Sequence, residues 1–269
     1  PTTNSSVIRK LTKGSDITIN QEKDGWYKVS DENGNSGWIV TWAAKPTYFA
    51  KPSTTNRKEV LGYYAESYKG DSRALQSFAG NTDKITTIAP FLYQVDKNGN
   101  ISGQNKSQLT QTANTKGIKV LAVVTNINSS NFSKEVISTM LRNKSARSRT
   151  ISKILRLIKE EGYSGVNIDF EGVPSRDRPY LTAFFRELAS VLHSHDYLVT
   201  AALPAKTATE EWSSWSGAYD YQAIAPYLDM GVVMTYDQHY AKGPAGPVAS
   251  QEWVENVLRY SLRYFPPHR

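Results

Sequence analysis

The chain has 269 residues, of which 39% are hydrophobic, a share typical of folded proteins, and its formal net charge is +7. It contains no cysteine, which excludes disulfides, thiolate nucleophiles and cysteine-ligated metals. No apolar run of about 18 residues is present, so membrane insertion is not expected. The positive charge favours a polyanionic partner, such as nucleic acid, an anionic membrane surface or an anionic cell wall.

Nucleic acid is not the partner that the charge pattern predicts. The basic residues are dispersed, and their densest cluster, residues 142–149, falls where a solvated connection between helices is expected. The pair His193 and His195 is spaced i, i+2, which places the two side chains on different faces of a helix. No metal site is therefore predicted.

Residues 16–40 have the pattern of a small all-β unit. Short alternating segments at 16–21, 26–30 and 36–40 are separated by the turn formers Asp24-Gly25 and Asn33-Gly34. Together with Gly37-Trp38, the stretch Gly25-Trp26 resembles bacterial Src-homology-3-like domains, which often dock hydrolases onto cell walls. Trp26 and Trp38 are either core residues or ligand contacts. Residues 46–57 contain two prolines and many small polar residues, so we expect domain 1–45, linker 46–57 and domain 58–269.

After residue 58 the chain alternates apolar strands with helical patterns, which predicts an α/β fold with a parallel sheet. The expected strands are 60–64, 85–93, 118–125, 165–170, 198–203 and 231–236, and the clearest helices are 150–161, 179–194 and 251–264. A doubly wound sheet and a (β/α)8 TIM barrel both fit this rhythm. No Gly-x-Gly-x-x-Gly or Walker loop follows the first strand, which favours the barrel. Six βα units are counted, so we expect a barrel truncated after the sixth unit, or one completed by another polypeptide.

One strand carries three polar residues on a single face. Asn167, Asp169 and Glu171 are spaced by two, so they project from the side of the strand opposite Val166 and Ile168. Two carboxylates on an inner face are costly to bury unless they are hydrogen-bonded or used in function. The alternative is a structural polar network at the strand end. Repulsion between the carboxylates would keep a proton on Glu171, at the rim, so that it could protonate a leaving group.

The stretch Gly-Val-Asn-Ile-Asp-Phe-Glu resembles the Asp-x-x-Asp-x-Asp-x-Glu signature of glycoside hydrolase family 18. Ser164 and Asn167 stand for the first two aspartates, whereas Asp169 and Glu171 are kept. The asparagine is similar to that of the branch containing spore-cortex and peptidoglycan N-acetylglucosaminidases. Residues 61–64, 89–93 and 233–240 resemble the first, second and sixth strands of the family.

The resemblance implies substrate-assisted retention, in which the acetamido oxygen of the sugar attacks the anomeric carbon. Glu171 would be the acid and base, Asp169 would hold the acetamido N–H, and Tyr236 with Asp237 would position the acetamido carbonyl. No metal or organic cofactor is implied. The expected substrate-binding residues are Asn167, Tyr64, Tyr93, Met234 and Gln238. Tyr64, Tyr93 and Met234 would form walls for the sugar, and packing within the barrel is the alternative role for these three.

The leading hypothesis is a secreted, cell-wall or spore-associated glycosidase that cleaves β-1,4 bonds in peptidoglycan or cortex. A chitinase shares the chemistry. A non-catalytic chitinase-like glycan-binding protein is the third reading, although such proteins usually lose the glutamate that this chain keeps as Glu171. The sequence leaves the oligomeric state open.

Overall fold

The computed structural model describes residues 5–15, 17–31, 33–44, 58–68, 70–128, 131–240 and 243–269. The chain divides into two compact units, Pro1–Tyr48 and Phe49–Arg269. The expected linker, residues 46–57, lies outside the described residues. None of the helices in the described ranges combines the length and the apolar character that crossing a membrane requires.

The first unit is a three-stranded antiparallel sheet in the order β1-β2-β3. Its strands are β1 (Thr18–Lys23), β2 (Trp26–Ser30) and β3 (Ser36–Val40), and the short 3-10 helix η1 (Thr41–Ala43) follows. The β1–β2 turn is Asp24-Gly25, with φ values of 51° and 80°, which are the positive angles that a two-residue hairpin turn requires. Trp26 and Trp38 are half-buried and line a cavity of about 480 Å³ within this unit.

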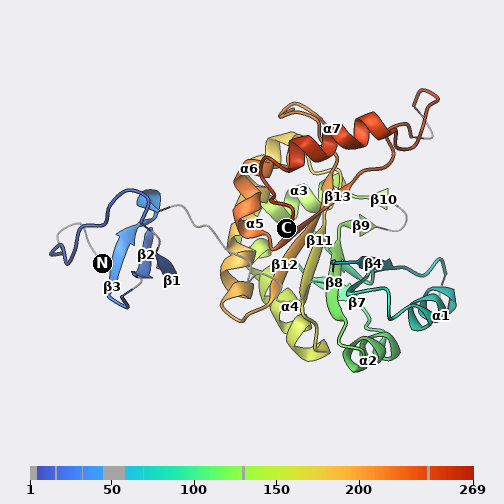
Figure 1. The fold of residues 1–269 in the computed structure, drawn as a ribbon, viewed down its shortest axis with the longest axis horizontal. Coiled ribbons are helices and arrows are strands. Elements are labelled where there is room, and N and C mark those ends of the chain that lie inside the picture. The colour runs from blue at the N-terminus through green and yellow to red at the C-terminus, as the bar shows by residue number, and fades with distance from the viewer. Residues whose placement is uncertain are drawn as a thin grey trace. The chain divides into compact units, whose positions relative to one another are not determined.

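The second unit contains a curled sheet with helices along it (Figure 1). Its strands are β4 (Leu61–Tyr64), β5 (Thr87–Pro90), β6 (Tyr93–Val95), β7 (Ile101–Gly103), β8 (Lys119–Thr125), β9 (Ile127–Asn128), β10 (Asn131–Phe132), β11 (Gly165–Asp169), β12 (Leu198–Pro204) and β13 (Met230–Met234). Its helices are α1 (Arg73–Gly80), α2 (Ser107–Thr115), α3 (Lys134–Arg142), α4 (Lys144–Glu161), η2 (Ser175–Asp177), α5 (Arg178–His193), α6 (Tyr221–Ile224), η3 (Ala225–Tyr227) and α7 (Gln251–Ser261).

The order of the parallel strands distinguishes the two folds that the sequence allowed. The strands run β13-β12-β11-β8-β5-β4, and every neighbouring pair is parallel. The order follows the chain without the reversal that a doubly wound sheet has at its centre. The predicted barrel-type α/β fold with six βα units is therefore confirmed for the described residues, among which β4 and β13 are the two edges of the sheet.

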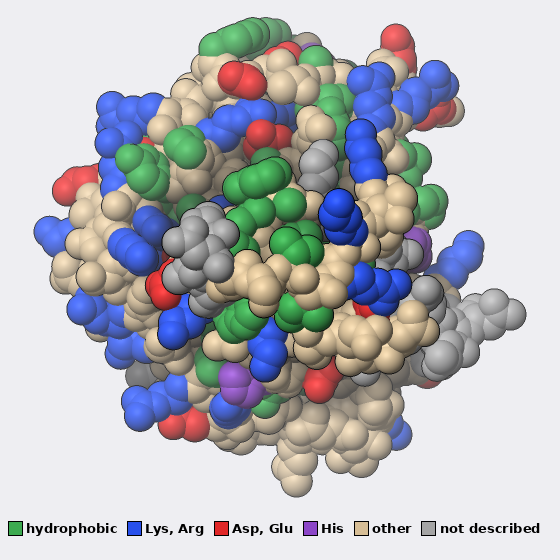
Figure 2. All heavy atoms as spheres, turned by 90° about the vertical axis from the view of Figure 1, so that its left-hand side faces the viewer, with side chains coloured by type: hydrophobic (Ala, Val, Ile, Leu, Met, Phe, Trp, Pro, Cys, Tyr) green, Lys and Arg blue, Asp and Glu red, His purple; other side chains and the backbone are tan. Residues whose placement is uncertain are grey.

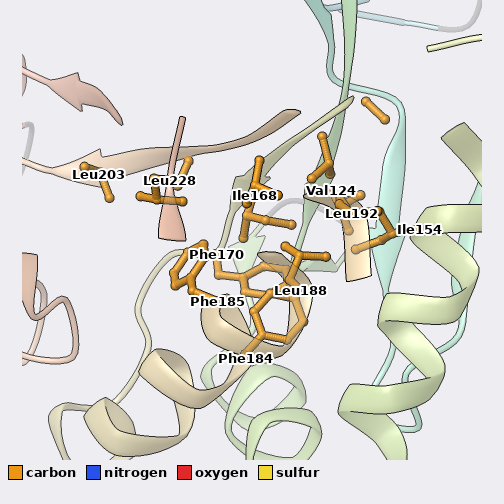
Figure 3. Packing of buried hydrophobic residues seen from close by; sticks show 14 of the residues in the cluster. Val124, Ile154, Ile168, Phe170, Phe184, Phe185, Leu188, Leu192, Leu203 and Leu228 are labelled. Atoms are coloured by element: carbon orange, nitrogen blue, oxygen red, sulfur yellow. The ribbon is translucent and has the colours of Figure 1, made fainter. Parts of the chain in front are cut away.

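The core lies between the sheet and its helices. The predicted apolar stripe of α5 is confirmed, because Leu181, Phe184, Phe185, Leu188 and Leu192 are all fully buried. They pack with Ile168 and Phe170 of the β11 segment, and the ring centroids of Phe170 and Phe184 lie 5.4 Å apart (Figure 3). A smaller cluster, centred on Ala89, Leu121 and Val123, lies on the opposite face of the sheet. The inner and outer faces of β11 are thus distinguished as the alternation predicts.

The basic cluster at residues 142–149 is only in part the solvated connection that we expected, because α3 ends at Arg142, exposed Asn143 joins the helices, and the rest of the cluster lies in α4. Asn143 caps α4 by accepting hydrogen bonds from the backbone N–H groups of Ser145 and Ala146, so the helix begins at Lys144 rather than at residue 150. Arg147 is buried and donates to both carboxylate oxygens of Glu187, at 3.0 and 2.8 Å. On the face drawn in Figure 2, Lys and Arg side chains are spread among neutral and acidic ones.

Gly165 fixes the spacing between β11 and β12. A Cβ atom at this position would lie 2.2 Å from the carbonyl oxygen of Leu198. We therefore predict that Gly165→Ala destabilises the second unit by roughly 2–4 kcal/mol, because backbone must move to relieve the overlap. Thermal unfolding followed by circular dichroism measures the effect. The matched control is Gly80→Ala, where a Cβ would meet nothing within 4 Å, and an equal drop in both variants would contradict the assignment.

Candidate active site

The polar residues of β11 meet at the carboxyl end of the sheet. Asn167 is fully buried, Asp169 is 5% exposed, and Glu171 follows the strand and is half-buried. β11 lies between β8 and β12, with Asp169 opposite Thr125 and Asn167 opposite Thr200. Asn167, Asp169 and Glu171 are therefore positioned by a strand in the middle of the sheet rather than by an edge strand.

The side-chain amide of Asn167 has partners at both ends. Its Oδ1 accepts from the hydroxyl of Tyr63 at 3.0 Å, and its Nδ2 donates to Oγ1 of Thr200 at 2.8 Å. Thr200 in turn donates to the carbonyl of Val166 at 2.9 Å. The amide is thus a neutral, hydrogen-bonded floor beneath the carboxylates, which removes the cost of burying it.

Asp169 differs from Asn167, because one of its carboxylate oxygens has no hydrogen-bond partner among the described residues. Its Oδ1 atom is buried and accepts no hydrogen bond from the described residues. Burial raises the pKa of this carboxyl to about 6. A buried acceptor without a donor is uncommon in folded proteins, and at the mouth of a site it is suited to a donor that arrives with a ligand.

Glu171 holds its proton more strongly than an ordinary glutamate. Burial raises its pKa to about 7, and the negative charges of Asp169 and Asp237 act in the same direction. The carboxyl is therefore largely protonated in mildly acidic solution, where it can act as a proton donor.

Two residues that sequence reasoning missed hold the backbone around Glu171. Asn126, fully buried at the end of β8, accepts from the Glu171 N–H at 2.8 Å and donates to its carbonyl at 2.9 Å. The hydroxyl of buried Tyr219 donates to the carbonyl of Phe170. Asn126 had one available signal, since it directly follows the apolar strand 118–125 at the edge where the carboxylates gather.

Tyr236 and Asp237 reach the same region from the segment after β13. Burial raises the pKa of Tyr236, and the charges of Glu171, Asp169 and Asp237 contribute in that order. Tyr236 is 55% exposed, so its ring is open to a ligand. Asp237 has a φ of 57°, a left-handed conformation that few residues other than glycine adopt.

The other expected substrate contacts are distributed differently. Half-buried Met234 ends β13 opposite Pro204. Gln238 uses its Oε1 to accept from the Ser250 N–H at 2.8 Å, while its own N–H donates to the carbonyl of Val248 at 2.9 Å. The side-chain oxygen of Gln238 is therefore occupied by the loop that leads into α7.

Tyr64 and Tyr93 lie in the core rather than beside the carboxylates. Tyr64 is 2% exposed and donates to Glu66 at 2.6 Å, while Tyr93 is 3% exposed and its hydroxyl lies 2.9 Å from that of Tyr163. Their contacts are those of packed side chains, which was the alternative to a role as walls for the sugar. Tyr63, one position earlier on β4, is the tyrosine that reaches Asn167, because alternate residues of a strand face opposite sides.

In the described ranges, no three His, Asp or Glu side chains are grouped as a metal ion would need. The arrangement consists of a glutamate carboxyl with a raised pKa, a buried aspartate with a free acceptor oxygen, and a partly exposed tyrosine. Chemically, it can donate a proton to one atom of a ligand while accepting a hydrogen bond from another.

Similar proteins have related sequences and folds. Residues 59–264 match the family model of the glycosyl hydrolases family 18, and residues 1–41 match that of the bacterial SH3 domain. The uncharacterized glycosylase YvbX of Bacillus subtilis is 33% identical over 196 residues, which are 72% of this chain and 57% of YvbX. The cortical fragment-lytic enzyme of Bacillus anthracis is 27% identical over 228 residues, which are 84% of this chain and 50% of that enzyme.

Solved structures show the same relationship. The spore cortex-lytic enzyme SleL of Bacillus cereus superposes with a TM-score of 0.73 at 26% identity, covering 78% of this chain and 48% of SleL. A chitinase from Chromobacterium violaceum superposes with a TM-score of 0.69 at 25% identity, covering 77% of this chain and 65% of the chitinase. This chain spans about half the length of the curated relatives that it matches. With its barrel-type sheet and a family match over residues 59–264, the chain belongs to the glycosyl hydrolases family 18.

Proposed function

We propose that this chain hydrolyses a β-1,4 glycosidic bond of an N-acetylglucosamine-containing glycan, with peptidoglycan or spore cortex as the substrate. The observation that carries the proposal is the pairing of Glu171, whose pKa is about 7, with the unoccupied buried acceptor of Asp169. A glycosidic oxygen needs a proton before it can leave. An acetamido N–H needs an acceptor, and Asp169 provides one beside the donor.

In the proposed reaction, the acetamido oxygen of the substrate attacks the anomeric carbon while Glu171 protonates the departing glycosidic oxygen. The C–O bond breaks and a cyclic, positively charged intermediate forms on the sugar. Asp169 accepts a hydrogen bond from the acetamido N–H, and its negative charge offsets the positive charge of the intermediate. The Tyr236 hydroxyl donates a hydrogen bond to the acetamido oxygen as that oxygen approaches the anomeric carbon. Glu171, now ionised, removes a proton from a water molecule, whose oxygen bonds to the anomeric carbon from the face opposite the acetamido oxygen. The bond between that carbon and the acetamido oxygen breaks, which regenerates the acetamido group and restores the original configuration.

The preference for peptidoglycan rests on three observations. Relatives of this chain are cortical fragment-lytic enzymes, the bacterial SH3 match adds a module of the kind that docks on walls, and the net charge of +7 favours an anionic wall. Action in the secreted, wall or spore compartment follows from that substrate. The likeness to a solved chitinase keeps chitin as the second candidate. We also propose residues 1–45 as the wall-docking domain and 58–269 as the catalytic domain, joined by linker 46–57.

Replacing the acid tests the proposal most directly. Glu171→Gln removes the transferable proton, and we expect release of new reducing ends from purified peptidoglycan to fall roughly 10²–10⁴-fold, read by mass spectrometry of the products. The same assay on chitin oligomers separates the two substrates. Glu160→Gln, on the exposed face of α4, is the matched control and should keep full activity.

A folding defect in Glu171→Gln is distinguishable from a chemical one. Ionisation of a buried carboxyl whose folded pKa is raised destabilises the fold as the pH rises above its unfolded value, so the neutral glutamine should not lower the melting temperature at pH 8. Full hydrolytic activity in this variant would remove Glu171 from the mechanism.

The pH dependence follows from the two carboxyls. Asp169 must be ionised, which requires a pH above about 6, and Glu171 must be protonated, which requires a pH below about 7. We expect a bell-shaped profile of kcat/KM with its maximum between these values. In Asp169→Asn, loss of the neighbouring charge should lower the pKa of Glu171, and carboxyl-carbon NMR titration measures it. An unchanged Glu171 titration would show that the two groups are not coupled.

Asn126 should set the position of the acid rather than the affinity for substrate. Asn126→Ala removes both hydrogen bonds to the Glu171 backbone, and we expect kcat to fall roughly 10–100-fold with KM changed less than threefold. Asn126→Asp keeps an acceptor for the N–H but has no donor for the carbonyl, and its added charge should also raise the pKa of Glu171. A rise in KM with kcat unchanged would contradict a positioning role.

A further inference from the structure

The segment between β12 and α6, residues 205–220, carries two exposed tryptophans that the proposed chemistry does not use. Trp212 is 81% exposed and Trp215 is 50% exposed. Large aromatic side chains are normally buried, because an indole that is left in water forgoes the hydrophobic stabilisation that burial provides. Two of them within four residues on one surface segment call for a partner.

The backbone beneath these tryptophans is held by short-range hydrogen bonds. The Ser213 hydroxyl accepts from the N–H groups of Trp215 and Ser216, at 3.4 and 3.2 Å, and the Gly217 N–H donates to the Ser213 carbonyl at 3.0 Å. A Cβ on Gly217 would lie 2.5 Å from the carbonyl oxygens of Glu211 and Ser213, so the turn is closely packed. The two indoles are thus presented from an ordered backbone, which lowers the entropic cost of binding.

The buried ammonium of Lys206 holds the same segment through hydrogen bonds to its backbone. Lys206 is 4% exposed, and its Nζ donates to the carbonyls of Ser216 and Tyr219, at 3.3 and 2.9 Å. Its charge also lies over the ring of Tyr221, 5.7 Å from the centroid. Burying a lysine is costly, and here the ammonium fixes the end of the turn that carries Trp215.

The segment is also tied to the residues that surround Glu171. The Tyr219 hydroxyl donates to the carbonyl of Phe170, the residue before Glu171. Four residues beyond Glu171, Ser175 lies against Gly217, whose carbonyl accepts from Arg178 at 3.0 Å. Because β11 and β12 are parallel neighbours, the segments that follow them both lie at the carboxyl end of the sheet. The tryptophans therefore stand on a rim that is anchored to the catalytic segment.

The chemistry of the rim favours a carbohydrate over a protein partner. The sequence neighbours of Trp212 and Trp215 are the polar residues Glu210, Glu211, Ser213 and Ser214, so the neighbouring side chains along the segment add no apolar surface to the indoles. A protein interface instead needs a contiguous buried apolar centre. A pyranose ring offers a flat C–H face for stacking and hydroxyls that can accept from the indole N–H or bond to the serines and glutamates.

We propose that Trp212 and Trp215 form a secondary binding platform for the glycan strand, away from the bond that is cut. The identity of the ligand as a glycan rests on the proposed function. The platform would bind sugar units of a long strand that a disaccharide cannot reach, so it would favour polymeric substrates over short ones.

Binding in the full chain with Glu171→Gln tests this without cleavage. Calorimetric titration would use peptide-free peptidoglycan glycan strands as the long probe and the corresponding disaccharide as the short one. In this background, we expect Trp212→Leu or Trp215→Leu to weaken binding of the long strands roughly fivefold to tenfold, with disaccharide binding unchanged. Trp212→Phe and Trp215→Phe keep a flat ring and should retain affinity within about twofold.

Three results would overturn the platform. The Leu variants could bind long strands as tightly as their parent, the Phe variants could lose as much affinity as the Leu variants, or disaccharide binding could fall to the same extent as strand binding. The proposed function fails separately, through absence of cleavage by the chain with both tryptophans and Glu171 intact. A chain that binds strands through the tryptophans without cutting them would therefore retain the platform and refute the hydrolase.

Discussion

The structure depends on enclosing both faces of β11. One face supplies Ile168 to the packing against α5, together with Phe170 just beyond the strand, and the other carries Asn167 and Asp169 into the curled interior. A polar side chain in such a place must find partners or remain costly. The solutions differ at successive inward positions: Asn167 is bonded at both ends, whereas Asp169 keeps an unused acceptor. The site arises from that difference within a single strand.

The same enclosure sets the proton affinities. Desolvation is the largest cause of the raised pKa values of both Asp169 and Glu171, and the charge of the first adds to the effect on the second. A well-packed sheet thus raises the pKa of the acid into the range of mildly acidic or neutral solution, through desolvation first and neighbouring negative charge second. Ionising these buried carboxyls lowers the free energy of unfolding, because their charged forms are poorly solvated. Such a loss of stability in favour of activity is common at functional sites.

Much of this architecture could be predicted from local pattern. The alternation in residues 165–171 separates inward from outward side chains, and the rhythm of apolar runs gives six parallel strands. Pattern alone does not tell which of the two adjacent tyrosines of Leu61–Tyr64 faces the site, because their strand propensities are equal. The side-chain hydrogen bond to Asn167 on β11 identifies Tyr63. The start of α4 was missed because its first turn has no apolar stripe. Tyr219 could not be found at all, since its hydroxyl meets a residue 49 positions away.

Asn126 has a wider consequence. The position of Glu171 along the sheet is set by a side chain that belongs to the neighbouring strand, through a pair of bonds resembling one rung of a β-ladder. The backbone position of the acid is therefore set by a fully buried side chain at the end of β8 rather than by the surface loops beyond Asp237. A lineage that inherits this arrangement can lengthen, shorten or recombine those loops, and so explore new glycans, while the inherited acid stays where it was.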